Sequence, residues 1–338
     1  MSEVGSPVIS EQSWLQPGEV LIHVGPRKTG SSTVQEALAL ADDNLRSLGF
    51  FLAPKVVDGS RAAQGALFKK RRQLWRTATD VVKQRGPQDR GLVSEEMLHR
   101  LDLQQAERVV KTLGGPDQVR ILITNRPLTK AMPSLWQQLV KTGFTSDSLS
   151  DWLTNLLEHP DSPDWRSQRL DRYYDHWSQV VPVDRIAILP VGYGPGDLLL
   201  EFEQLTGIPE NYLDRRTSNT SLTAEQAEMM RIRNKELAKA DVHLRRHKLN
   251  RPPLGKRKHG TSIVLPEWAR PQVSAIQAEL TENIIAREAF VLGGAERLRL
   301  LPELPPEIPL SDSAIEFARF AGRYVANVIE ISSNQPEG

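Results

Sequence analysis

The stretch that decides the fold is residues 20–38, Val-Leu-Ile-His-Val-Gly-Pro-Arg-Lys-Thr-Gly-Ser-Ser-Thr-Val-Gln-Glu-Ala-Leu. Its apolar run at 20–24 is short enough for a buried parallel strand. The chain then breaks at Gly25-Pro26. After the break, Val34, Leu38 and Ala41 recur at the spacing of one helical face. The pattern therefore predicts a strand, a glycine-bearing turn and the start of a helix.

The segment between this strand and this helix is built to hold an anion. The N–H groups of a first helical turn have no carbonyl partner within the helix, and the helix dipole adds partial positive charge there. Lys28 adds a full charge, and the hydroxyl side chains can donate hydrogen bonds. We expect the ligand to carry phosphate or a similar group, held by Arg27, Lys28, Thr29, Gly30, Ser31, Ser32 and Thr33.

Two familiar nucleotide motifs do not fit this segment. Gly25 and Gly30 have the separation of a Walker loop, but Ser31-Ser32 stand where that loop has Lys followed by Ser or Thr. A dinucleotide fingerprint would need a glycine at Arg27. A plain strand-to-helix turn with a hydroxyl cap stays possible, although such a turn needs neither Arg nor Lys.

The order Lys28-Thr29-Gly30-Ser31-Ser32 resembles the 5′-phosphosulfate-binding loop of sulfotransferases that use 3′-phosphoadenosine 5′-phosphosulfate (PAPS). The longer string His-Val-Gly-Pro-Arg-Lys-Thr-Gly-Ser-Ser is similar to the bacterial branch of that family. The resemblance covers roughly residues 20–240. It implies a P-loop-like α/β fold, PAPS as co-substrate, and a small-molecule or carbohydrate acceptor.

The resemblance also implies a second anchor for the same nucleotide. In the family, an arginine after a strand and a serine eight residues later hold the 3′-phosphate. Here Arg126 follows the apolar run at 119–124, and Ser134 stands at the matching distance. A guanidinium offers a planar fork of donors suited to phosphate. Pro133 should kink the helix that carries Ser134 or mark its true start.

The expected reaction is in-line displacement at sulfur. Lys28 is placed by the resemblance to neutralise charge on the leaving phosphate. The acceptor needs a general base, and relatives use a histidine or a glutamate after a sheet strand. The strand at 91–94 delivers Glu95 to such a place, so Glu95 is our first expectation. The other candidates are Glu96, His23, His99 and His176.

Two further polar segments are candidates by resemblance. Family members often place a basic, glycine-containing segment late in the chain over the nucleotide, and the segment at 251–260 could do this, line an acceptor cleft or be solvated charge. Its cations are Arg251, Lys256, Arg257 and Lys258. The string at 215–222 also resembles a segment of the bacterial enzymes and could approach the adenosine.

Composition limits the other possibilities. The 338-residue chain has a formal net charge of +1, which gives no bulk field for nucleic acid or membrane. It has no cysteine, which excludes disulfides, thiol catalysis and cysteine-ligated metal. No run approaches the roughly 20 apolar residues of a membrane span, and residues 1–19 have no apolar core. We expect a cytoplasmic protein. We also expect no required metal, because no cluster of His, Asp or Glu has metal-ligand spacing.

Strands and helices alternate along most of the chain, which predicts a three-layer α/β fold around a mainly parallel sheet. The expected strands are 20–24, 50–53, 91–94, 119–124 and 185–191. The expected helices up to 207 include 31–47, 102–113, 148–158, 165–180 and 198–205, with a basic helical segment at 67–85. Helices at 223–240, 267–290 and 312–329 then add to the sheet domain.

We expect a single domain over 19–330, with the helical addition from about 223, a flexible stretch at 1–18 and a disordered tail at 331–338. Oligomeric state is not readable. Two functions compete with sulfuryl transfer. One is an atypical nucleotide kinase, which would need a magnesium-binding acid at a strand end. The other is a non-catalytic nucleotide- or anion-binding protein, because the acceptor side shows no signature.

Overall fold

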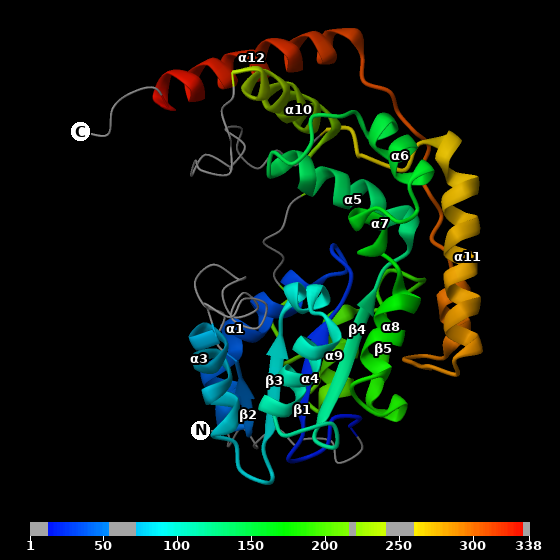
Figure 1. Ribbon diagram of the computed structural model, residues 1–338. Coiled ribbons are helices and arrows are strands. Elements are labelled where there is room, and N and C mark those ends of the chain that lie inside the picture. The colour runs from blue at the N-terminus through cyan, green and yellow to red at the C-terminus, as the bar shows by residue number, and fades with distance from the viewer. Residues whose placement is uncertain (1–12, 54–71, 216–220, 241–259, 334–338) are drawn as a thin grey trace, which may run out of the picture. The chain divides into compact units, whose positions relative to one another are not determined.

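The computed structural model describes residues 13–53, 72–215, 221–240 and 260–333 (Figure 1). These residues belong to two compact units. The first comprises Met1–Pro127, Arg166–Ser218 and Ile276–Pro302, and the second comprises Leu128–Trp165, Asn219–Ala275 and Glu303–Gly338. The expectation of one domain over 19–330 stays a prediction.

A six-stranded sheet forms the centre of the first unit, and every neighbouring pair in it is parallel. Its order is β2 (Phe50–Leu52), β3 (Arg90–Ser94), β1 (Val20–Val24), β4 (Val119–Asn125), β5 (Ile186–Pro190) and β6 (Phe290–Val291). β1 is buried along its whole length, as an apolar run in the middle of a parallel sheet should be. The predicted parallel sheet is confirmed.

Helices cover both faces of this sheet (Figure 1). Leu21 packs in a cluster with α1 (Ser31–Ser47) and α9 (Leu198–Thr206). Its neighbours Val20 and Ile22 point to the opposite face, because side chains alternate along a strand. There they pack with α3 (Arg72–Lys83), α4 (Leu103–Thr112) and α8 (Leu170–Ser178). The expected three-layer α/β architecture is confirmed.

The second unit is helical. α5 (Leu128–Lys141) packs against α6 (Leu149–Glu158) and α10 (Ala224–Lys239), and α10 packs against α12 (Asp312–Ser333). α10 begins with the predicted capping box, in which Thr223 and Gln226 exchange hydrogen bonds. α11 (Arg270–Ala286) follows a 3-10 turn, η5 (Glu267–Ala269), and the boundary between the units falls within it.

The structure corrects two expectations and adds one strand. The single helix predicted at 165–180 is wrong: α7 (Pro163–Arg166) and α8 are separated by an irregular segment that includes Gln168. Pro133 does not mark the start of its helix, since α5 already begins at Leu128. β6 was not predicted; it is a two-residue strand that exists by pairing with β5, Val291 lying opposite Ile188.

The described part of the first unit also contains the 3-10 segments η2 (Glu96–Arg100), η3 (Val183–Arg185) and η6 (Ala295–Arg299).

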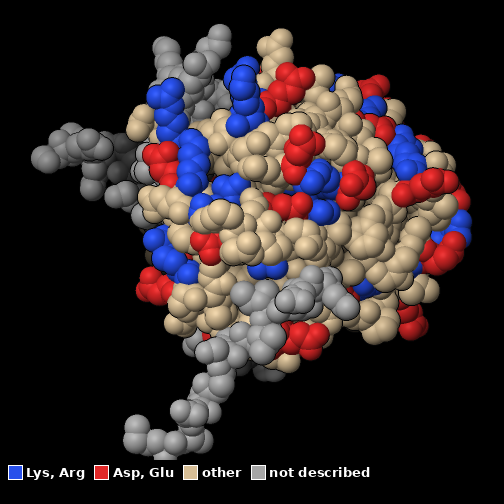
Figure 2. All heavy atoms as spheres, turned by 90° about the horizontal axis from the view of Figure 1, so that it is seen from below, with Lys and Arg blue, Asp and Glu red and all other residues tan. Residues whose placement is uncertain are grey.

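The surface shown in Figure 2 has no patch of one charge sign: acidic and basic side chains are interspersed over it. This even distribution agrees with the formal net charge of +1.

Candidate functional site

The polar residues singled out in the sequence follow neighbouring parallel strands. The loop at 25–30 follows β1, Glu95 follows β3, and Arg126 follows β4. The chain leaves β1 toward β2 on one side and later passes from β3 to β4 on the other side. β1 therefore marks a topological switch point, and ligands of open α/β sheets bind outside the carboxyl ends of the strands at such a point.

The loop between β1 and α1 depends on its two glycines. A Cβ on Gly25 would lie 2.5 Å from Oγ1 and 2.6 Å from the carbonyl oxygen of Thr124, so no other residue fits there without displacing β4. Gly30 has a φ of 92°, in the left-handed region. Lys28 also has a left-handed backbone, with a φ of 72°, which is strained for a residue with a side chain.

The start of α1 offers positive potential without a competing cap. Gly30 is the N-cap, no side chain caps the helix, and the first turn contains no acidic residue. The N–H groups of Ser31 and Ser32 have no carbonyl partner within the helix by the geometry of a first turn. The side chain of Ser31 is buried, whereas that of Ser32 is exposed. An anion at this helix start would be stabilised by both N–H groups and the dipole.

Hydrogen bonds between buried side chains connect the loop to the strands β1, β3 and β4. Thr29 Oγ1 donates to the carbonyl oxygen of Pro26 at 2.8 Å and lies 2.9 Å from Thr124 Oγ1. His23 Nε2 lies 3.3 Å from Thr124 Oγ1, and His23 Nδ1 lies 2.8 Å from Ser94 Oγ. Thr124 Oγ1 also donates to the carbonyl oxygen of Val24 at 3.4 Å, so this one hydroxyl joins β4 to β1, to Thr29 and to His23.

This arrangement makes His23 a structural residue of the loop. Burial lowers the pKa of His23 to about 4, so the imidazole is neutral at neutral pH. The neutral ring links β1 to Ser94 on β3 and to Thr124 on β4. Sequence reasoning considered His23 as a base and as a core histidine, and its contacts fit the second role. Thr124 was not singled out, because nothing in an apolar strand marks one hydroxyl as a loop support.

Arg126 comes to the same loop. Its Nη1 donates to the carbonyl oxygen of Lys28 at 3.4 Å. Burial lowers the pKa of Arg126, but a guanidinium stays charged at neutral pH. Gln168, from the segment between α7 and α8, donates to the carbonyl oxygen of Arg27 at 3.4 Å. The guanidinium of Arg126 is thus bonded to the loop that carries Lys28, and its assignment to the 3′-phosphate stays a prediction.

The two adjacent glutamates at the end of β3 have different surroundings. Glu95 is buried, and its backbone N–H donates to the carbonyl oxygen of His23 at 3.1 Å. Glu96, the first residue of η2, turns its carboxylate to the loop: Oε2 accepts a hydrogen bond from Ser31 Oγ at 3.0 Å, and Oε1 lies 3.9 Å from Arg27 Nε. Glu96 therefore has the carboxylate with described contacts to the loop.

The other two histidines considered as bases, His99 and His176, lie in helical segments, as expected. His99, in η2, donates from Nδ1 to the carbonyl oxygen of Glu96. His176 lies on α8. Burial lowers the pKa of both.

Several predicted residues are not brought to the loop by any described contact. Ser134 is half-buried on α5, in the second unit, so its pairing with Arg126 stays a prediction. Most of the basic segment at 251–260 lies outside the described residues, as do positions 216–220 of the other candidate segment. The basic residues at 69–71 lie there too.

Within the described ranges there is no group of three or more His, Asp or Glu side chains suited to a metal ion. None of the helices in these ranges is long and apolar enough to cross a membrane.

No family model matches the chain, and no curated protein matches it. Among solved structures, the chain is similar to a sulfotransferase from Alicyclobacillus acidocaldarius, with 14% identity and a TM-score of 0.44 over 80% of this chain and 95% of that one. The function below is therefore argued from the residues of the loop.

Proposed function

We propose that this chain is a sulfotransferase that moves the sulfuryl group of PAPS to a hydroxyl or amine of a small-molecule or carbohydrate acceptor. The observation that carries the proposal is the hydrogen bond from the Arg126 guanidinium to the backbone carbonyl of Lys28, in a loop that ends at an uncapped helix start. A guanidinium bonded to a lysine-bearing loop, together with the N–H donors of a helix start at a switch point, suits a ligand with more than one anionic group.

The nucleotide is expected to lie with its phosphosulfate on the loop at 27–33. The N–H groups at the start of α1 and the hydroxyls of Ser31, Ser32 and Thr33 would hold the sulfuryl oxygens, and Thr29 would support the loop through its bond to Pro26. Arg126, together with Ser134, would hold the 3′-phosphate. This assignment rests on the resemblance of the loop and on the position of Arg126 after β4.

In the proposed reaction, the acceptor oxygen attacks sulfur, and the bond between sulfur and the oxygen of the 5′-phosphate breaks. The electron pair of that bond goes to the leaving 3′-phosphoadenosine 5′-phosphate, and Lys28 neutralises the charge that develops there. The acceptor proton passes to a carboxylate base. The sequence favours Glu95 for this role, whereas the contacts of Glu96 with Ser31 and Arg27 favour Glu96.

A screen of acceptors with labelled PAPS tests the reaction, with sugars, small phenols, peptidyl tyrosine and lipids as the acceptor classes. Transfer to at least one class, lost in Lys28→Met and kept in Lys111→Met, is expected. Lys111 is an exposed cation on α4 and serves as the matched control. If the protein binds the nucleotide but transfers to no acceptor, the alternative of a silent binding protein is favoured.

A further inference from the structure

α12 has two apolar faces, and among the described residues of the second unit only one of these faces is packed. Ala318, Gly322, Ala326 and Ile329 are buried. They follow one helical stripe, and α12 packs against α10. The opposite stripe is exposed: relative accessibilities are 56% for Phe317, 71% for Phe320, 64% for Tyr324 and 45% for Val328. Large side chains at this exposure and spacing form a contiguous apolar face, which marks an interaction site.

The packing of α12 on α10 presents this face rigidly. A Cβ on Gly322 would lie 2.6 Å from the carbonyl oxygen of Met229 and 3.0 Å from Cβ of Ile232, both on α10. The backbones therefore approach so closely that only glycine fits at the crossing. A helix held in this way cannot rotate its aromatic side chains inward without losing that contact.

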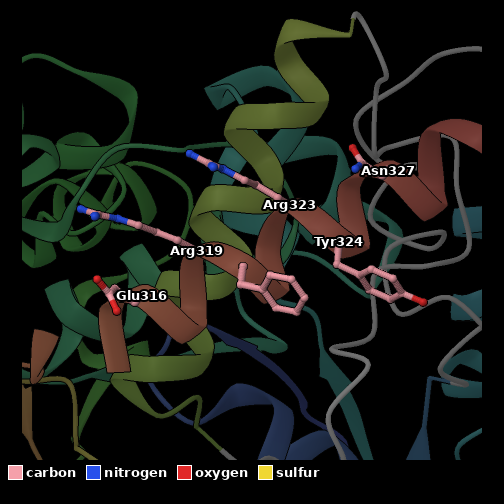
Figure 3. Close-up of a pocket in the computed structure, with 6 residues that line it drawn as sticks. Glu316, Arg319, Arg323, Tyr324 and Asn327 are labelled. Carbon is pink, nitrogen blue, oxygen red and sulfur yellow. The ribbon is translucent and has the colours of Figure 1, made fainter. Parts of the chain in front are cut away.

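The exposed face combines aromatic and charged side chains. It includes an open hollow of about 370 Å³ lined by Glu316, Arg319, Phe320, Arg323, Tyr324 and Asn327. In Figure 3 the side chains of Arg319 and Arg323 extend to one side of α12, and the ring of Tyr324 extends to the other. The loop residues of the candidate site do not line this hollow.

We propose that this face binds α12 of a second copy of the chain, antiparallel and about a two-fold axis. Phe317, Phe320 and Tyr324 stand at successive a, d and a positions of a heptad. In an antiparallel pair an a residue meets a d residue of the partner helix. Phe317 then packs against Phe320 of the second copy, and the symmetry repeats this contact, so four aromatic rings form the centre.

The flanking residues match this register. Glu316 and Arg323 occupy g positions one heptad apart, and in the antiparallel pair each Glu316 lies beside Arg323 of the second copy. On the other flank, Ala314 meets Ala321, and their small side chains let the helices approach. A parallel pair would place Glu316 beside Ala321 and leave the charges unmatched. Both arrangements can have two-fold symmetry, but of the two only the antiparallel pair places Glu316 beside Arg323.

Sedimentation equilibrium of the full chain over a range of concentrations tests the interface. We expect a reversible dimer, and Phe320→Ser should weaken the dimer at least about tenfold. Leu40→Ser is the matched control, because Leu40 is 66% exposed on α1 and its loss should leave the dimer unchanged. A chain that is monomeric at every concentration, or two variants with equal effect, would overturn the proposal.

Charge exchange tests the register. Glu316→Arg and Arg323→Glu should each weaken the dimer, since each places like charges together. The double variant should restore it, because the pair is rebuilt with its signs reversed. A double variant that is as weak as the sum of its parts contradicts the antiparallel pairing. Weakening by Phe320→Ser without any rescue would indicate another occupant of this face or another register. Neither result depends on nucleotide binding, so the outcome is independent of the proposed reaction.

Discussion

The hydroxyl of Ser31 donates a hydrogen bond to Oε2 of Glu96 at 3.0 Å. Ser31 is the first residue of α1 and Glu96 the first residue of η2, so this bond joins the anion-binding end of a helix to the turn that follows β3. A carboxylate beside a helix start is stabilised by the dipole. The same carboxylate would lie beside the sulfuryl group if the loop binds PAPS, where an acceptor hydroxyl must lose its proton.

Replacement of this carboxylate should separate chemistry from binding. In Glu96→Gln we expect transfer to fall by about 10²–10⁴-fold, the usual contribution of a general base. Affinity for 3′-phosphoadenosine 5′-phosphate should hold or rise, because a negative charge beside an anion site is removed. Rates and affinities measured on one preparation check both effects.

The matched variant is Glu95→Gln. Because Glu95 is buried, its replacement could affect folding, so the free energy of unfolding of this variant is measured as well. It should keep most of the transfer activity. The reverse outcome, an active Glu96→Gln and a folded but inactive Glu95→Gln, would assign the base as the sequence first suggested.

Gly25→Ala should damage the loop. The new methyl group would overlap both the hydroxyl and the carbonyl oxygen of Thr124, and overpacking of this kind costs about 1–3 kcal/mol. We expect nucleotide binding to be lost as well, because the loop must move. Gly115→Ala is the control: Gly115 has a φ of 98° but open space around it, so stability should fall while binding holds. Urea denaturation and nucleotide titration distinguish the two, and normal binding by Gly25→Ala would contradict the loop geometry.

His23 should make stability depend on pH between about 4 and 6.5. The unfolded chain binds a proton here near pH 6.5, and the folded chain near pH 4, because burial disfavours the charged imidazole. The unfolded state binds more protons in this window, so the free energy of unfolding falls as the pH falls, by about 3 kcal/mol in total.

His23→Asn should lose this part of the pH dependence. Burial also lowers the pKa of His99 and His176, but these residues are present in both proteins, so the difference between wild type and variant isolates His23. Urea denaturation at a series of pH values provides the measurement. Identical slopes for the two proteins would show that His23 is not buried in a neutral form.

A buried hydrogen-bonded pair, Arg233 and Asn234, should stabilise the second unit. Arg233 is 1% exposed, and its Nε and Nη2 donate to Asn234 Oδ1 at 3.1 and 2.8 Å. Asn234 in turn donates to the carbonyl oxygens of Val140 and Thr145. Asn234→Ala removes the acceptor of a buried charge and should cost about 3–5 kcal/mol. Asn44→Ala, at an exposed position on α1, should change stability little, and a similarly small effect for Asn234→Ala would contradict the buried contact.

The sequence allowed prediction of the parts of the fold that local pattern determines. β1 and α1 have the predicted bounds, because a short apolar run followed by glycine and a 3.6-residue apolar period leaves few alternatives. The cap at Thr223 was readable for the same reason. By contrast, β6 is two residues long and depends on pairing with β5, which no local pattern encodes.

At the candidate site, the residue types were readable but not their orientation. Arg126 was singled out as a ligand of the 3′-phosphate, a role that stays a prediction, and its bond to the backbone of Lys28 was not foreseen. Which of two adjacent glutamates turns toward Ser31 could not be predicted. Glu95 keeps an extended backbone, with φ −144° and ψ 102°, and the 3-10 turn starts only at Glu96. The orientation of each carboxylate is set by that turn. The contact of Gln168 with the loop was not predicted, because the sequence pattern placed this residue within a continuous helix at 165–180.

The most direct test of the central claim is the affinity of the protein for 3′-phosphoadenosine 5′-phosphate relative to ADP. A charge-assisted hydrogen bond contributes about 1.5–3 kcal/mol, so we expect a preference for the bisphosphate of at least about tenfold, without magnesium. Arg126→Ala should abolish the preference, and Arg108→Ala, at an exposed arginine on α4, should preserve it. Equal affinities, or tighter binding of ADP that requires magnesium, would contradict the sulfotransferase assignment.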